Sequence, residues 1–293
     1  MIWAALLPPS DFVNPQGVTY AMLKLTDQEF IELKTFVHKN YGIDLSKKRV
    51  LIEGRMSSTI MGLGFTSFRQ YMDYLYADKT GNEMTRMLNK LTTNYTYFMR
   101  ENAHFEFLTQ KILPYFERTR TNKTLYLWSA GCSSGQEPYS VAMAINEYFG
   151  SKKSMWNTMM LASDLSVNVL EKASKAVYTK DEIKDIPPSW RSKYLIDLKD
   201  GNYRVCDQIR NDVVFRRVNL MDPFNFKNKF DLILCRNVMI YFDAPTKEKL
   251  VSKFYDWTSE SGFLFIGHSE SINRDGSAYS YIQPAIYQKR GAK

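Results

Sequence analysis

The sequence predicts an α/β domain with a parallel sheet and a small antiparallel β insertion, preceded by a small all-α domain. Residues 24–90 repeat apolar side chains at helical spacing and contain no strand-like run. After about residue 122, short apolar runs alternate with helical segments, which is typical of a parallel sheet with helices on both faces. The 293 residues are 44% hydrophobic and 24% charged, so the chain can bury a large core without disulfides, and disorder is excluded.

Four helices are expected in the first domain, over residues 23–91. Thr26 and Glu29 have the spacing of a capping box, so the first helix begins there. The pattern predicts later helices at about 44–61, from 66 through at least Leu75, and at about 83–91. Residues 1–22 are expected to be a disordered leader, with Met22 as an alternative natural start.

Five strands are expected in the α/β domain, over residues 123–293, after a linker and connecting helix at 92–122. They fall at 125–128, 159–162, 213–215, 230–235 and 263–267. The interval at about 185–211 breaks the strand–helix alternation, with Pro187-Pro188 and a turn at residues 200–202. We therefore predict a small antiparallel insertion there.

Charge and cysteine content limit the environment and the partners. The net charge of +8 favours an acidic partner, which is nucleic acid, anionic lipid or an acidic protein surface. Cys132, Cys206 and Cys235 are odd in number and match no zinc spacing, so a cytoplasmic location is expected. No run approaches the roughly 20 apolar residues of a membrane helix, so no membrane insertion is expected.

The most informative segment is Trp128-Ser-Ala-Gly-Cys-Ser-Ser-Gly-Gln-Glu-Pro-Tyr139. A strand, a glycine-rich turn and a helix N-terminus follow one another, which exposes backbone N–H groups to a ligand. No Lys or Arg occurs from Trp128 to Tyr148, and the carboxylate of Glu137 would repel a pyrophosphate. The segment therefore disfavours NAD, FAD and ATP. It favours a cationic nucleoside without phosphates, such as S-adenosylmethionine.

Other candidate site residues follow the remaining strands, where open α/β sheets bind ligands. Asp164 ends the second strand and is either a ribose ligand or a helix N-cap. Asn219 follows the third strand and is either an adenine contact or a turn residue.

The fourth and fifth strands supply further candidates. Arg236, Asn237 and Tyr241 follow the fourth strand, and a buried arginine is costly unless it is paired. His268 follows the fifth strand and is either a catalytic base or a hydrogen-bonded structural histidine.

Two more motifs are informative when they are considered together with the glycine-loop segment and the sequence after the fourth strand. The first contains Asn94, Thr96, Phe98 and Arg100, and the second is Phe265-Ile-Gly-His-Ser-Glu270. Together with Cys235-Arg-Asn-Val-Met-Ile-Tyr-Phe-Asp243 they resemble the CheR family, the methyltransferases of chemotaxis receptors, over about residues 23–289. The resemblance implies an S-adenosylmethionine-dependent methyltransferase (Rossmann-like) domain that methylates receptor glutamates. Where the family often has Thr-Gly-Glu, this chain has Ser134-Gly-Gln followed by Glu137.

The resemblance also implies site residues. The positions that match the family's cofactor-binding residues are Asn94, Thr96, Arg100, Glu137, Asp164, Asn219, Leu220, Cys235 and Arg236. Those near the transferring methyl group, and hence catalytic, are Arg100 and Tyr241. S-adenosylmethionine is the implied cofactor, S-adenosylhomocysteine the product, and no metal is implied.

The implied partner is the cytoplasmic helical domain of methyl-accepting chemotaxis receptors, with no nucleic acid and a monomeric enzyme. Lys47, Lys48, Arg49 and Arg55 are candidate substrate-docking residues, or else a solvated helix face. The loop at residues 198–203 holds one glycine, which suits a tight turn and leaves little room for a receptor pentapeptide to add as a strand.

Two alternatives stay open. A nucleic-acid methyltransferase would also explain the basic charge, but Arg236-Asn-Val-Met replaces the Asn/Asp-Pro-Pro-aromatic motif of base-amino methylation. A non-catalytic S-adenosylmethionine-sensing module is the other alternative, and the presence of Arg100 and Tyr241 speaks against it.

Overall fold

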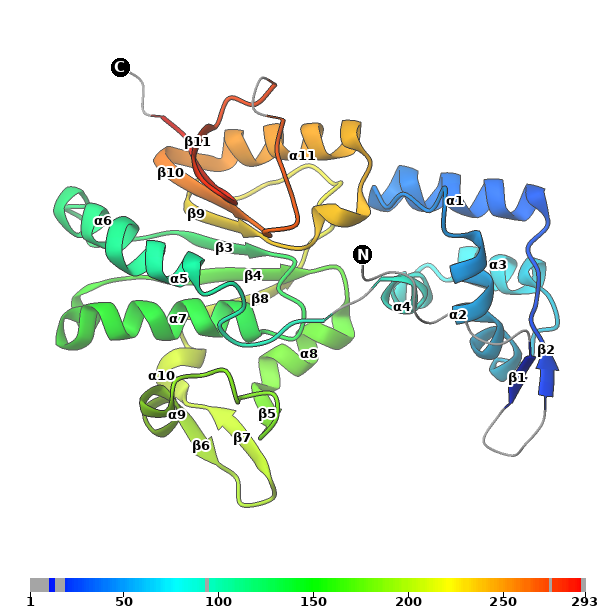
Figure 1. Ribbon diagram of the computed structural model, residues 1–293, viewed down its shortest axis with the longest axis horizontal. Coiled ribbons are helices and arrows are strands. Elements are labelled where there is room, and N and C mark those ends of the chain that lie inside the picture. The colour runs from blue at the N-terminus through cyan, green and yellow to red at the C-terminus, as the bar shows by residue number, and fades with distance from the viewer. Residues whose placement is uncertain (1–10, 14–18, 93–94, 274–275, 291–293) are drawn as a thin grey trace. The chain divides into compact units, whose positions relative to one another are not determined.

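The computed structural model describes residues 11–13, 19–92, 95–273 and 276–290, with side chains from residue 22 onward. The chain divides into two compact units, Met1–Asn94 and Tyr95–Lys293 (Figure 1). Within the described ranges, no helix combines the length and the apolar character needed to cross a membrane.

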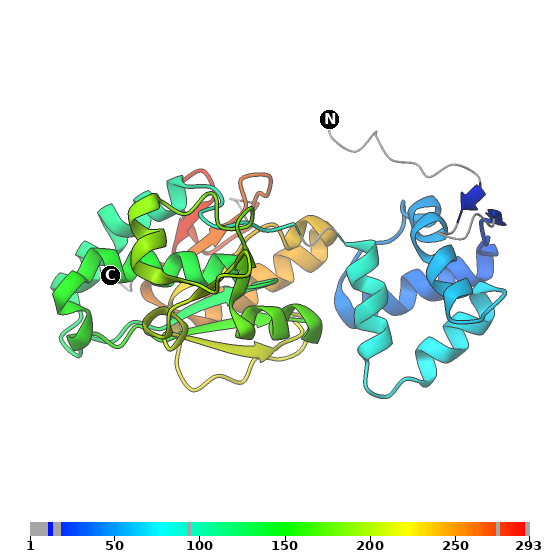
Figure 2. The same cartoon turned by 90° about the horizontal axis from the view of Figure 1, so that it is seen from below.

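The first unit is built on four helices, seen in blue to cyan in Figure 2. They are α1 Asp27–Tyr41, α2 Arg49–Gly62, α3 Phe68–Ala77 and α4 Asn82–Leu91. The predicted capping box is confirmed, because the Thr26 hydroxyl accepts the Glu29 N–H at 3.2 Å and the Glu29 carboxylate accepts the Thr26 N–H at 2.7 Å. Helix α2 begins later than predicted, because the Asp44 carboxylate accepts the Ser46 N–H and closes a turn.

Two short strands lie in the segment expected to be a disordered leader. They are β1 Asp11–Val13 and β2 Thr19–Ala21, which pair antiparallel. The rest of that segment, up to residue 18, lies outside the described residues. The structure therefore differs from the expectation at these six positions.

A seven-stranded sheet organises the second unit, with the order β11-β12-β10-β9-β3-β4-β8. The five predicted strands are confirmed as its parallel part. They are β3 Leu127–Ala130, β4 Met160–Asp164, β8 Val213–Arg217, β9 Phe230–Cys235 and β10 Thr258–Ile266. Two antiparallel strands at the edge were not predicted, β11 Ser280–Gln283 and β12 Ile286–Gln288. Strand β11 is half-exposed and therefore lacks the apolar run that marks the others.

The order of the strands fixes where a ligand is expected. Strands β4 and β8 lie on one side of β3, whereas β9 and β10 lie on the other. This is the topological switch point at which open α/β sheets bind ligands, outside the carboxyl ends of the strands.

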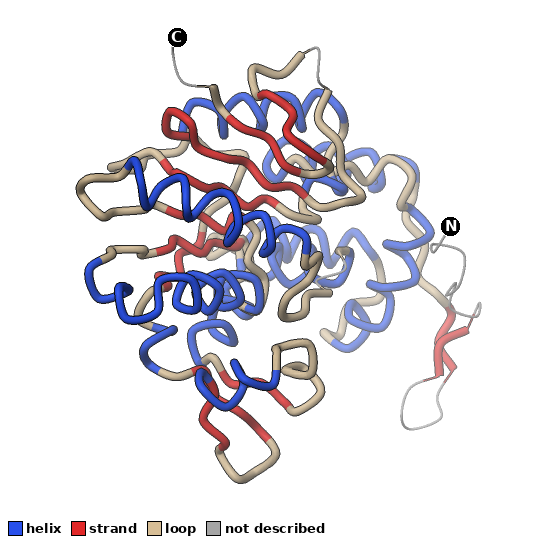
Figure 3. The backbone as a smooth tube through the Cα atoms, turned by 60° about the vertical axis from the view of Figure 1, so that its left-hand side comes forward, coloured by secondary structure: helices blue, strands red, loops and turns tan. Residues whose placement is uncertain are grey.

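Helices cover both faces of the sheet, as Figure 3 shows. On one face, a continuous helix packs with α7 Gln136–Phe149 against side chains that include Leu127, Leu232 and Phe265. That continuous helix consists of α5 Ala103–Phe107, the π-helical turn η1 Leu108–Ile112 and α6 Leu113–Thr119. On the other face, α11 Ala244–Trp257 places Phe254 against the fully buried Trp128.

The segment expected to be a linker and connecting helix is therefore part of the second unit's core. Phe105, Leu108 and Ile112 are buried in the same cluster as the sheet. Each such side chain contributes about 1.5–3 kcal/mol on burial, so the helix is bound firmly to the sheet.

The predicted antiparallel insertion is present as a three-stranded sheet with the order β5-β7-β6. Its elements are β5 Val177–Thr179, α9 Pro188–Tyr194, β6 Leu195–Asp197, β7 Asn202–Val205 and α10 Asp207–Arg210. It begins earlier than the predicted 185–211, because Ala176 takes a left-handed conformation, ends α8 Val167–Lys175 and leads directly into β5.

Candidate active site

The glycine loop after β3 is held against the end of β4. The N–H groups of Gly131 and Cys132 donate to the Ser163 carbonyl at 2.8 and 2.9 Å. Gly131 has a φ of +100°, and a Cβ there would lie 2.3 Å from the Val238 side chain. A glycine is therefore required by both the backbone conformation and the close approach of the loop after β9.

Asp164 joins the loops that follow β3 and β4. Its Oδ2 accepts the Ser133 N–H at 2.9 Å, and its Oδ1 accepts the Ser166 N–H at 3.0 Å. Burial raises the pKa of Asp164, while these backbone donors oppose the shift. Ser166 takes the N-cap position of α8, so the N-cap alternative for Asp164 is wrong.

Arg236 is buried between two carboxylates. Its Nη1 donates to Glu137 Oε2 at 2.9 Å, and its Nη2 lies 3.2 Å from Glu101 Oε2 and also donates to the Arg100 carbonyl. The side chain is 2% exposed. The other Glu137 oxygen accepts the Ser129 hydroxyl at 2.6 Å. The sequence suggested that Glu137 and Arg236 face a ligand, and the structure also pairs them with each other.

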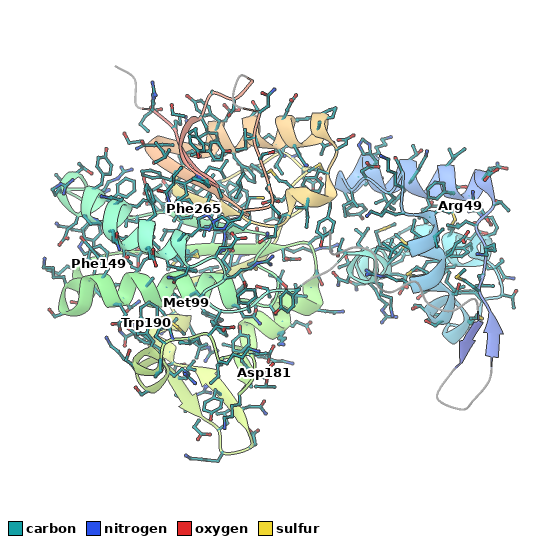
Figure 4. The ribbon with its side chains drawn as sticks, in the orientation of Figure 1. Arg49, Met99, Phe149, Asp181, Trp190 and Phe265 are labelled. Carbon is teal, nitrogen blue, oxygen red and sulfur yellow. The ribbon has the colours of Figure 1, made fainter. Side chains whose placement is uncertain are left out.

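Two left-handed non-glycine residues flank Arg100. The neighbouring Met99 and Glu101 have φ angles of 59° and 58°, and each residue in this region costs about 1–3 kcal/mol. The Met99 N–H donates to Ser140 Oγ at 3.0 Å, and Figure 4 marks Met99 beside α7. Together with the Arg236 contact to the Arg100 carbonyl, this bond fixes the segment.

The Arg100 side chain is left without an acidic partner in the described part of the chain. Its guanidinium donates to the Tyr95 carbonyl at 2.8 Å and lies 5.7 Å from the Tyr97 ring centroid. The side chain is half-buried. Arg100 thus offers a positive charge that no described carboxylate neutralises.

Two other predicted site residues, Cys235 and Tyr241, lie at the end of β9 and in the turn that follows it. Cys235 is fully buried at the end of β9, and burial raises the pKa of its thiol. Tyr241 is half-buried in the turn η3 Met239–Tyr241. Thr96 is half-buried, and Asn94 lies outside the described residues.

The loop after β8 is closed by its own side chains and by α11. Asn219 Oδ1 accepts the Met221 N–H at 3.1 Å, as expected of a turn asparagine. Lys253 donates to the Leu220 carbonyl at 2.7 Å and to the Asp222 carbonyl at 2.6 Å. Burial lowers the pKa of Lys253 to about 8.

The sequence did not single out Glu101, Glu270 or Lys253. Glu270 accepts the N–H groups of Asn237 and Gly267 at 2.8 and 2.6 Å, so it joins the loops after β9 and β10. Glu101 lies directly after one quoted motif and Glu270 ends another, so the sequence could have indicated both residues. Lys253 lies on an amphipathic helix and carried no signal.

The predicted docking residues do not form one free basic face. Lys47 is exposed and Lys48 half-exposed, and both precede α2. Arg49, labelled in Figure 4, pairs with Asp27 at 2.5 Å and Glu53 at 3.4 Å. Arg55 is exposed but donates to the carbonyl of Lys90 at 3.0 Å and to that of Leu91 at 3.3 Å.

Comparisons with known proteins agree with this arrangement. The family model "CheR methyltransferase, all-alpha domain" matches residues 28–92, and "CheR methyltransferase, SAM binding domain" matches residues 94–287. The chain is 42% identical over 273 residues to the chemotaxis protein methyltransferase of Borreliella burgdorferi, covering 91% of this chain and 96% of that protein. The chain belongs to the CheR methyltransferase family.

Other CheR relatives are similar over comparable lengths. Identity is 33% over 258 residues to chemotaxis protein methyltransferase 2 of Vibrio cholerae, covering 87% of this chain and 89% of that protein. It is 33% over 284 residues to the chemotaxis protein methyltransferase of Escherichia coli, covering 93% and 96%. The chain is therefore an S-adenosylmethionine-dependent methyltransferase, and the relatives favour this interpretation over a nucleic-acid enzyme or a non-catalytic module.

The residues at the sheet edge of this CheR chain fit S-adenosylmethionine. The Asp164 carboxylate lies at the end of β4, where a ribose would be held. Ser133 Oγ is buried in the glycine loop without a hydrogen-bond partner, so a ligand group there would satisfy it. The loop and α7 contain no Lys or Arg, which suits a cation.

We predict that Asp164→Ala weakens binding of S-adenosylmethionine and S-adenosylhomocysteine by about 1–3 kcal/mol, because it leaves polar groups unpaired and frees the glycine loop. Titration calorimetry measures both affinities. Asp181→Ala is the control, because Asp181, labelled in Figure 4, is exposed and pairs with the exposed Lys184. Equal affinities in wild type and Asp164→Ala would remove Asp164 from the cofactor site.

Proposed function

We propose that this CheR-family enzyme methylates side-chain carboxylates of glutamates in the cytoplasmic helical domain of chemotaxis receptors. The observation that carries the proposal is Arg100, a half-buried cation with no acidic partner in the described chain, fixed beside the carboxyl ends of β3 and β9. The relatives are named chemotaxis protein methyltransferases, which supports the proposal.

The acceptor needs no general base. A glutamate side chain has an ordinary pKa of about 4.3, so it is an anionic nucleophile at neutral pH. The cofactor supplies a methyl group on positively charged sulfur. The enzyme's contribution is to position the two groups and to exclude water.

We assign the roles from the contacts of each residue. Arg100 binds and orients the incoming carboxylate, because its guanidinium has no acidic partner among the described residues. Tyr241 shapes the methyl pocket from the turn after β9. Asp164 holds the ribose, and Asn219 with the Leu220 backbone holds the adenine, supported by Lys253.

The helical unit is the proposed docking site for an acidic receptor helix. Because Arg49 and Arg55 bind groups within their own unit, the exposed Lys47 is the proposed residue of this cluster that attracts the partner. We propose that the enzyme acts as a monomer in the cytoplasm and binds no nucleic acid.

The proposed acceptor is tested by the chemistry of the product. Radiolabelled S-adenosylmethionine is incubated with the enzyme and receptor-containing membranes. We predict that mild alkali releases the label from protein as volatile methanol, because carboxyl esters hydrolyse under conditions that leave methylamines intact. Label that survives alkali would contradict the carboxylate acceptor.

We predict that Arg100→Ala lowers kcat about a hundredfold, because the carboxylate loses its orienting partner. The affinity for S-adenosylmethionine should change much less. Arg118→Ala, which removes an exposed arginine from α6, is the matched control. If turnover and cofactor affinity fall equally, Arg100 is only a cofactor ligand.

We predict that the enzyme does not need a receptor pentapeptide as a tether, because residues 198–201 form a short turn between β6 and β7. Docking should instead weaken with salt, because exposed charges are screened over about 8–10 Å. The measurements are a titration with a C-terminal receptor pentapeptide and receptor binding at two ionic strengths. Lys47→Gln should reduce the salt dependence, whereas Lys199→Gln, in the exposed turn, should not. Saturable pentapeptide binding with salt-independent docking would overturn this prediction.

A further inference from the structure

Three side chains that could bind a metal ion lie close together beside the Arg100 segment. None of them has a role in the proposed reaction. They are Glu101, His104 and His268, each with one donor atom within 4.8 Å of the others. We propose that they form a binding site for a divalent transition-metal ion of the zinc class. Two imidazoles and one carboxylate are a donor set that zinc accepts, with further positions left for water.

The buried imidazole of His104 supplies the first argument. The residue is 1% exposed, and among the described residues neither ring nitrogen forms a hydrogen bond of good geometry, the Ala285 carbonyl being only a weak acceptor. The ring stacks on Phe265, labelled in Figure 4, at 4.8 Å between centroids and 19° between planes. A buried polar group without a good hydrogen bond is rare in native proteins, so this one calls for a ligand.

The geometry around His104 suits an ion. His104 Nδ1 lies 3.5 Å from Glu101 Oε2. Two ligands bonded tetrahedrally to Zn²⁺ at about 2.0–2.2 Å lie about 3.3–3.6 Å apart. One ion would therefore bridge these two atoms with little movement of either side chain.

His268 completes the set from the protein surface. Its backbone N–H donates to Glu101 Oε1 at 3.2 Å, which anchors the residue. Its ring centroid lies 5.0 Å from that of His104, and the residue is exposed. An exposed ring can rotate toward an ion and gives the ion an entry path.

Carboxylates outnumber guanidinium groups beside the cluster. Glu101, Glu137 and Glu270 contribute three carboxylates, whereas Arg236 is the guanidinium paired with two of them.

The experiment measures binding of Zn²⁺ alone to the full chain by calorimetry, without cofactor or receptor, so that its outcome is independent of the proposed function. Co²⁺ absorption reports the coordination geometry. We expect one Zn²⁺ per chain, a rise in Tm on binding, and a loss of affinity in His268→Ala that exceeds the roughly 10–100-fold typical of outer-shell partners. This variant replaces an exposed side chain and leaves the core intact.

The chain offers matched controls. It has three histidines, and the third, His38, lies on α1, so His38→Ala should bind Zn²⁺ like the wild type. Cys206→Ser tests the half-buried thiol as a competing ligand. His104→Phe, which keeps an aromatic ring on Phe265, should also lose binding. The proposal is overturned if the wild type binds no Zn²⁺, or if His268→Ala and His104→Phe retain binding.

Discussion

The rest of the site depends on the ion pairs of the buried Arg236 guanidinium with two carboxylates. It follows β9 and contacts Glu137 at the start of α7 and Glu101 in the segment before α5. An unpaired charge at this depth would be strongly destabilising, so the three segments must remain together. The sheet edge, the glycine-loop helix and the Arg100 segment are thereby fixed by one side chain.

This pairing explains how strain beside Arg100 is tolerated. Met99 and Glu101, on either side of Arg100, both take the left-handed conformation, which would not persist in a free loop. Here Arg236 binds the Arg100 carbonyl, and Ser140 binds the Met99 N–H. The Arg100 side chain is thus held in advance of substrate binding, which is how positioning lowers a barrier without a base.

Local patterns in the sequence predicted the local structure. They could not predict which side chains from distant positions contact one another. The capping box at Thr26, the five parallel strands and the glycine loop follow from residue spacing. The edge strand β11 and the short β5 lack such patterns. The sequence did not show that Arg236 and Glu137 bind each other, because the contact joins positions 99 residues apart. Likewise, the basic cluster near α2 was predicted by charge, but Arg49 binds Asp27, 22 residues earlier.

The central claim is that Arg236 and Glu137 act as one unit, and a double-mutant cycle tests it most directly. The free energy of unfolding by urea is measured for Arg236→Met, Glu137→Gln and the double variant. Arg236→Met should lose about 3–5 kcal/mol by leaving buried carboxylates uncompensated, whereas Glu137→Gln should lose less, because Arg236 keeps its contact with Glu101. The double variant should lose less than the sum, by about 0.5–3 kcal/mol of coupling energy. Additive losses would contradict the account, because they would mean that the two side chains stabilise the site independently.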